Sequence, residues 1–334
     1  MADTDLAITG GEILLSDGQL TRANLGIAGG RITRVSTDPI AASETLDASG
    51  LTILPGLIDE HFHVFRNYGW ETYEGATRAA AKGGITTVVD MPLDNPAVLS
   101  EQAFREKLEA ISDACHVDFA LFAGDPDDAL DELDGMVGAG ARALKIFTGG
   151  VAPPGMYPGA DSGGILQLLR RCRELGIVAV AHCENAEIVD SETARLQAEG
   201  RDDVAAWDEA RPWFSEVEAV ARVALLAEAT GCKTVMAHLS SHQSVDAVTA
   251  ARARGADVWV ETCPHYLCLT TEEMAGDARM KWNPPSRDRE SVEQLWNQIA
   301  RGEIHTVGSD HAPLPKGEDA NIWDQLPGAG NGLE

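Results

Sequence analysis

The apolar residues of this chain gather in short runs, and five of these runs carry polar side chains that can hold a metal ion. Runs this short and rich in β-branched residues predict buried strands rather than helices. The polar side chains lie at or near the C-terminal ends of the runs, as in the active sites of (β/α)8 barrels. The runs span 57–63, 143–147, 177–182, 234–238 and 304–310, and their polar residues are His61, His63, Lys145, His182, His238 and Asp310.

Helical patterns separate these runs, and three further strands complete an alternating order. The additional strands are predicted over 85–90, 117–122 and 257–262. Alternation of strands and helices argues for a parallel α/β architecture. We therefore predict an α/β fold, a (β/α)8 TIM-like barrel, over residues 53–334. The helices are predicted over 73–82, 100–114, 128–137, 165–175 and 217–230.

The first part of the chain has a different pattern, with short strands separated by turns. Asp17-Gly18 and Gly29-Gly30 are hairpin signals between apolar strands. They predict a small β-sandwich domain, of which residues 1–52 form the N-terminal part. After Asp310 only a loop over 313–334 is predicted, with no eighth helix. We therefore expect the barrel to be truncated after strand eight, with its C-terminal part missing.

Length and charge narrow the possible partners. The 334 residues suffice for a barrel of roughly 250 residues and a small second domain. The net charge of −27 excludes nucleic acid and anionic membrane surfaces as expected partners. No apolar run reaches the roughly 18 residues of a transmembrane helix, and the N-terminus has no signal-peptide pattern. The six cysteines are scattered, which favours free thiols and a cytoplasmic location.

The strand-end residues predict a two-metal hydrolytic centre. His61 and His63 are two residues apart, so their imidazoles point to the same side of a strand and can reach one ion. Lys145 either pairs with an acid or, as a neutral amine, reacts with CO2 to give a carbamate that bridges two ions. His182 and His238 are either ligands or hydrogen-bonded core residues. Asp310 can bind metal and take a proton from a bridging water, whose pKa a metal lowers toward ~7.

Seven short motifs surround these residues: 55–63 (PGLIDEHFH), 143–147 (ALKIF), 181–185 (AHCEN), 237–241 (AHLSS), 261–267 (ETCPHYL), 283–285 (NPP) and 308–313 (GSDHAP). Together they resemble the amidohydrolase superfamily, in the cyclic amidohydrolase branch of allantoinase, dihydroorotase and hydantoinase. The resemblance implies two divalent ions, expected to be Zn2+, bridged by hydroxide and by Lys145 as N6-carboxylysine. It implies that one ion is held by His61, His63 and Asp310, and the other by His182 and His238.

The same resemblance implies hydrolysis of a C–N bond in a cyclic amide or ureide, with Asp310 as the catalytic proton carrier. Residues 91–96 (MPLDNP) are more similar to allantoinases than to dihydroorotases. Phe65 stands where dihydroorotases have an arginine, and Arg66 follows it. We therefore predict an allantoinase-like enzyme, with a dihydroorotase or a hydantoinase/dihydropyrimidinase-like enzyme as the alternative. Substrate contacts are predicted at Asn283, Phe65, Arg66, Ser240 and His311.

Two further expectations concern the substrate and the state of assembly. We expect a small-molecule cyclic ureide as the substrate and a homo-oligomer, a dimer or a tetramer, as the working form. A catalytically silent scaffold is the second class considered, because relatives of this branch include non-enzymatic assembly proteins. The presence of every expected ligand type argues against that class.

Overall fold

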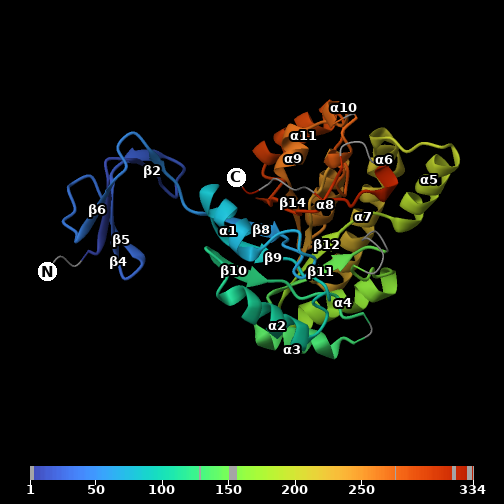
Figure 1. Cartoon of the computed structure of the whole chain (residues 1–334), viewed down its shortest axis with the longest axis horizontal. Helices are drawn as coiled ribbons and strands as arrows, with labels where there is room; N and C mark the ends of the chain where they lie inside the picture. The colour runs from blue at the N-terminus through green and yellow to red at the C-terminus, as the bar shows by residue number, and fades with distance from the viewer. Residues whose placement is uncertain are drawn as a thin grey trace. The chain divides into compact units, whose positions relative to one another are not determined.

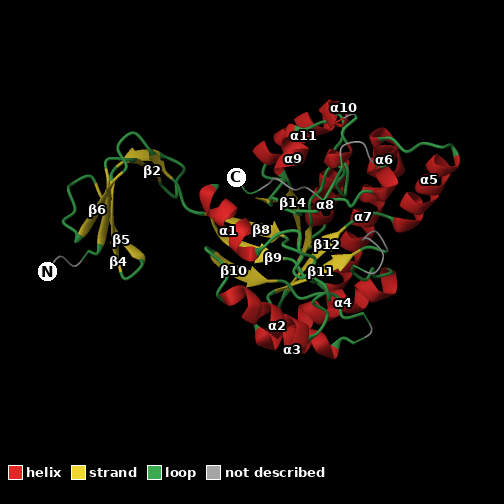
Figure 2. Ribbon diagram, viewed as in Figure 1, coloured by secondary structure: helices red, strands yellow, loops and turns green. Residues whose placement is uncertain are grey.

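The computed structural model describes residues 4–127, 129–149, 156–274, 276–317, 321–328 and 333. Contacts divide the chain into two compact units, Met1–Leu57 and Ile58–Glu334. Figures 1 and 2 show both units, the second with strands surrounded by helices. In the part of the chain that is described, no helix is both long and apolar enough to cross a membrane.

The N-terminal unit contains two small sheets that share an apolar core. Ile13, Ala23 and Leu25 are its buried members, and Ile8 and Ile53 pack against them. Gly18 and Gly29-Gly30 lie in the turns with positive φ, which glycine adopts without a steric penalty. This arrangement matches the predicted β-sandwich. One sheet has the order β5-β4-β1-β6 and the other β3-β2-β7, with β1 (Leu6–Thr9), β2 (Glu12–Leu14), β3 (Leu20–Arg22), β4 (Asn24–Ala28), β5 (Arg31–Ser36), β6 (Glu44–Asp47) and β7 (Thr52–Ile53).

The second unit contains the predicted barrel. Its strands form the hydrogen-bonded orders β10-β9-β8 and β11-β12-β13-β14-β15. Two parallel bridges join these sheets, between Phe62 and His311 and between Ala123 and Leu144, so the barrel closes. The strands are β8 (Leu57–Phe62), β9 (Ile85–Asp90), β10 (Asp118–Leu121), β11 (Ala143–Phe147), β12 (Val178–His182), β13 (Thr234–Met236), β14 (Val258–Thr262) and β15 (Thr306–Val307).

Helices follow the strands and cover them, as expected from the sequence. The predicted helix over 73–82 is confirmed, and Gly176 and Gly231 terminate their helices with left-handed φ. The main barrel helices are α1 (Tyr73–Lys82), α2 (Glu101–Ser112), α3 (Asp131–Ala139), α4 (Ser162–Leu175), α7 (Trp213–Thr230), α8 (His242–Ala253) and α11 (Arg289–Ala300). The shorter or inserted ones are α5 (Ala186–Ala198), α6 (Val204–Ala210), α9 (Pro264–Cys268) and α10 (Thr271–Met274).

Several element boundaries differ from the prediction, among them the start of α4 at Ser162 and the end of α2 at Ser112. The third helix begins at Asp131, and its predicted start at Asp128 lies outside the described residues. Helix α7 begins four residues before the predicted 217, because Pro212 fixes an extended N-cap directly before Trp213. The last strand pairs over only Thr306–Val307, because the chain then turns towards Asp310, whose φ is +49°. This turn brings the Asp310 carboxylate to the barrel opening.

Candidate metal centre

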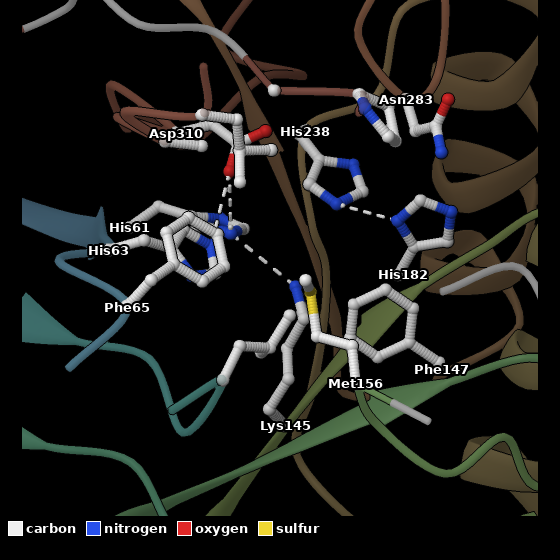
Figure 3. Close-up of a pocket in the computed structure, with 15 residues that line it drawn as sticks. His61, His63, Phe65, Lys145, Phe147, Met156, His182, His238, Asn283 and Asp310 are labelled. Carbon is white, nitrogen blue, oxygen red and sulfur yellow. Dashed lines mark hydrogen bonds and ion pairs between the residues drawn. The ribbon is translucent and has the colours of Figure 1, made fainter. Parts of the chain in front are cut away.

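The six strand-end residues meet at the carboxyl end of the barrel. His61 lies within β8, Lys145 within β11 and His182 at the end of β12, while His238 lies two residues after β13 and Asp310 three residues after β15. Parallel strands place their carboxyl ends at one opening, so residues far apart in sequence come together there. Figure 3 shows Lys145 rising between His61 and His63 on one side and His182 and His238 on the other. All six side chains are buried.

One half of the cluster consists of His61, His63 and Asp310. Asp310 Oδ1 lies 3.2 Å from His61 Nε2 and 3.4 Å from His63 Nε2. The Lys145 amine lies 3.4 Å from the same His61 nitrogen. Two imidazole nitrogens, a carboxylate oxygen and an amine therefore converge on one point, as ligands of a divalent ion do.

The other half consists of His182 and His238. His182 Nδ1 and His238 Nε2 face each other at 3.0 Å. Atoms of His61, His238 and Asp310 also lie within 4.8 Å of one another, which links the two halves. The two halves are thus close enough for one small group, carried by Lys145, to touch both.

Buried carboxylates determine which ring nitrogens face the centre. Glu261 Oε1 lies 2.6 Å from His61 Nδ1, and Glu184 Oε2 lies 2.8 Å from His182 Nε2. Arg211 Nη1, 2.5 Å from the same Glu184 oxygen, fixes that carboxylate in turn. Burial raises the pKa of Glu184, but Arg211 and His182 outweigh it and lower the value to about 2, so this carboxylate accepts from His182 Nε2 and the lone pair of His182 Nδ1 faces the centre. Glu261 would do the same for His61 when a cation beside it keeps it ionised. His238 Nε2 lies opposite His182 Nδ1, and a cation between the two would satisfy both, so the donor set fits metal ions.

Burial sets the charges of the cluster. It lowers the pKa of His61 and of His63 to about 4 and lowers those of His182 and His238, so these imidazoles are neutral and able to coordinate. Burial also lowers the pKa of the Lys145 amine. Neutral imidazoles are the form that ligates a metal, and a lowered amine pKa favours the neutral form from which a carbamate can form.

The carboxylic acids of the cluster respond differently. Burial raises the pKa of Asp310, but His61 and His63 outweigh it and hold the value well below the usual range. Burial raises the pKa of Glu261 to about 8. Divalent cations beside a carboxylate favour its ionised form and oppose such a shift.

Unusual backbone conformations set the direction of several of these side chains. Phe65, His238 and Asp310 have φ values of +55°, +41° and +49°, a region that non-glycine residues rarely adopt. Such conformations cost of order 1–3 kcal/mol each and cluster at functional sites. Their presence at three positions around one cavity supports a functional role for this end of the barrel.

A pocket opens above the cluster, and its remaining wall is largely apolar. Asn283 lies in this wall with its Oδ1 buried and without a hydrogen-bond partner. Phe65 also lines the pocket and stacks on His63 at 5.0 Å between ring centroids. The other residues of the wall are Leu93, Phe147, Met156, Ala312, Leu314, Pro327 and Gly328.

Three predicted substrate contacts are not among the residues that line this pocket, so contact with the substrate stays a prediction for them. Arg66 turns away, because its guanidinium Nε lies 3.2 Å from Asp94. Ser240 is buried and donates from Oγ to Glu216 at 2.5 Å. His311 Nε2 lies 2.7 Å from Glu71. The predicted contacts at Phe65 and Asn283 remain predictions with suitable positions.

Two acids beside the cluster and part of the pocket wall were not predicted from the sequence. Glu184 and Glu261 lie within the AHCEN and ETCPHYL motifs, so the motifs were a signal, although their letters do not say which histidine each acid contacts. Leu93, Met156 and Leu314 come from three separate loops. Their proximity had no local signal.

Comparison with known proteins identifies relatives of this chain. A family model described as "Amidohydrolase family" matches residues 52–331. An allantoinase from Deinococcus radiodurans is 37% identical, over 97% of this chain and 74% of the relative. An L-hydantoinase of Paenarthrobacter aurescens is 33% identical, over 98% of this chain and 72% of the relative. The structure of an L-hydantoinase (dihydropyrimidinase) from Arthrobacter aurescens superposes with a TM-score of 0.90 at 31% identity, covering 97% of this chain and 74% of that chain.

Proposed function

The chain belongs to the amidohydrolase family, and we propose that it is a metal-dependent hydrolase that opens a C–N bond of a cyclic ureide, with allantoin as the first candidate substrate. The observation that carries the proposal is the pair of facing ligand sets, with His61, His63 and Asp310 on one side and His182 and His238 on the other. The first candidate follows from similarity to allantoinases at 37% and 36% identity.

Each ligand set would hold one divalent ion, with zinc as the expected metal because its ligands are mainly imidazole. Lys145 would contribute as a carbamate. Its neutral amine nitrogen forms a bond to the carbon of CO2 and releases one proton, which leaves an anionic group with two oxygens. The lowered pKa of the buried amine and its place between the two halves support this assignment.

Individual residues of the chain would carry out separate parts of the reaction. When bound, divalent ions lower the pKa of water toward about 7 and polarise a carbonyl. Asp310, ionised and beside both histidines of its half, accepts the proton released as a water oxygen bonds to the ring carbonyl carbon. It returns that proton to the ring nitrogen as the C–N bond breaks, so water is added across the bond. Asn283, with its unpaired Oδ1, would orient a ring N–H of the substrate.

A second candidate substrate is a hydantoin with an apolar substituent. Outside the metal ligands, Asn283 is the one polar residue among the described residues that line the pocket. A ureido tail buried against Leu93 and Met156 would lose hydrogen bonds to water, whereas an apolar group would not. Comparing kcat/KM for allantoin and for a hydantoin with a benzyl substituent decides between the two candidates.

We also propose that the protein is a cytoplasmic homo-oligomer, a dimer or a tetramer. The described cysteines are all free thiols, as a reducing compartment favours. Trp213 and Phe214 at the start of α7 are 46% and 48% exposed, and large exposed aromatic side chains favour protein contacts. Light scattering at several protein concentrations tests the state of assembly.

Metal content gives the most direct test of the proposal. Purified protein supplied with zinc is expected to carry close to two divalent ions per chain. His63→Ala is expected to remove about one of them, because it deletes a ligand of only one half. Elemental analysis measures both values, and His116→Ala, on the exposed side of the barrel, is the control. Protein that binds no divalent ion at all would contradict the proposal.

Selectivity against anionic substrates is a second expected result. Dihydroorotate carries a carboxylate, and Phe65 cannot pair with it, whereas a hydrogen bond to a charged group contributes about 1.5–3 kcal/mol. We therefore expect kcat/KM for dihydroorotate to be at least about tenfold below that for allantoin. Phe65→Arg should reduce the ratio of kcat/KM for allantoin to kcat/KM for dihydroorotate. Arg66→Gln should leave it unchanged, since that guanidinium contacts Asp94. Faster turnover of dihydroorotate by the native chain would contradict this ranking.

A further inference from the structure

Glu261 touches both halves of the candidate metal centre with a single oxygen atom. The residue is 1% exposed and lies near the end of β14. Its Oε1 lies 2.6 Å from His61 Nδ1, and the same atom accepts a hydrogen bond from the backbone nitrogen of His238 at 3.1 Å. His61 belongs to one half of the centre and His238 to the other. The strand that supplies Glu261 contributes no ligand itself.

The backbone of Glu261 holds the same region. Its carbonyl accepts a hydrogen bond from the nitrogen of Leu239 at 2.8 Å, so two consecutive residues after β13 are tied to it. His238 has a φ of +41°, a conformation that needs support from its surroundings. The two contacts from Glu261 supply that support and fix the direction of the His238 imidazole.

The His61 side of the contact has little freedom to shift. A methyl group built at Gly308 would lie 2.9 Å from Cβ of His61 and 3.3 Å from the carboxyl carbon of Glu261. The absence of a side chain at this position is what allows His61 and Glu261 to approach each other. Because Glu261 Oε1 contacts both residues, a displacement of this carboxylate would affect His61 as well as His238.

We propose that Glu261 is a positioning residue that couples the two metal subsites. One carboxylate oxygen fixes the tautomer of His61 and the backbone of His238, so its loss weakens both subsites together. Glu184 provides a contrast, because among the described residues the one candidate metal ligand to which its side chain bonds is His182, in one half. Groups that orient metal ligands typically change metal affinity by about 10–100-fold. The proposal rests on the metal centre proposed above.

Cobalt(II) is a suitable probe, because its visible spectrum reports ligand geometry in the loaded protein. The experiment titrates metal-free protein with cobalt and follows the spectrum and the rate of metal release to a chelator. Glu261→Leu is expected to lower the affinity of both ions by about 10–100-fold. Glu261→Gln retains an oxygen that can accept from both N–H groups, so it should recover most of that loss.

Two controls separate coupling from general damage. Glu184→Gln should weaken one ion only. Glu303→Gln should leave both affinities unchanged, because the carboxylate of Glu303 pairs with the exposed Arg301. Circular dichroism of the metal-free variants checks that each is folded, and the Gln variant keeps the test valid if the Leu variant is not.

The outcomes are distinguishable. Loss of both ions in Glu261→Leu, with recovery in Glu261→Gln, supports the coupling. Weakening of a single ion, or wild-type affinities in both Glu261 variants, overturns it while leaving the metal centre intact. A native protein that binds no cobalt would instead overturn the proposed function itself.

Discussion

Lys145→Ala is expected to remove both metal ions and lower kcat/KM by about 10³-fold or more. The expected size follows from the several kcal/mol that bound metal contributes to transition-state stabilisation, at about 1.4 kcal/mol for each tenfold change in rate. The physical reason is the position of the side chain. Its amine is 3.4 Å from His61 Nε2 and lies between the two ligand sets, and alanine leaves their shared contact empty.

The test combines metal analysis, steady-state rates and mass spectrometry. Native-state mass spectrometry should detect CO2 bound to the wild-type chain. Acetate or propionate added to Lys145→Ala should partly restore metal and activity, because a carboxylate can replace the two carbamate oxygens. Lys233→Ala, at the opposite end of β13, is the matched control and should lose neither. An unmodified Lys145 amine in active protein would rule out the carbamate.

Asp310→Asn is expected to lower kcat by about 10²–10⁴-fold, the usual contribution of a positioned proton carrier. An asparagine keeps an oxygen that can face His61 and His63 but cannot accept and return a proton. Metal content is therefore expected to fall much less than the rate. Wild-type activity in Asp310→Asn would show that another group moves the proton.

Asp59→Asn is the comparison for Asp310→Asn, because it changes the support of Asp310 and not the reacting atoms. Asp59 accepts hydrogen bonds from the Ser309 nitrogen at 2.9 Å and from Ser309 Oγ at 2.5 Å. Asp59→Asn is expected to lower kcat less than Asp310→Asn does. An equal loss in both variants would mean that the role of Asp310 is structural.

Much of the ligand set could be predicted from the sequence, because it depends on local periodicity. Side chains alternate along a strand, so His61 and His63 had to share a side. Parallel strands that alternate with helices had to place their carboxyl ends together. These two rules place His182, His238 and Asp310 at one opening from the sequence pattern alone. The glycines after α4 and α7 marked the helix ends for an equally local reason.

The substrate side of the site could not be predicted in the same way. Arg66, Ser240 and His311 are adjacent to or near proposed site residues in the sequence, but adjacent residues point in different directions. Each also has an acidic partner that the sequence does not reveal, such as Asp94 for Arg66. The positive φ of Phe65 further changes the direction of its loop. Long-range pairing therefore decided which of these residues line the pocket.

What the sequence determined by itself was the kind of fold and the identity of the candidate ligands, since both follow from patterns within single strands and motifs. Tertiary structure alone decided that Glu261 reaches both His61 and His238, residues from two other strands. Such contacts exist only once the barrel closes and its strands adopt a single register. Closure is a property of all the strands together, so no local pattern specifies which acid faces which histidine.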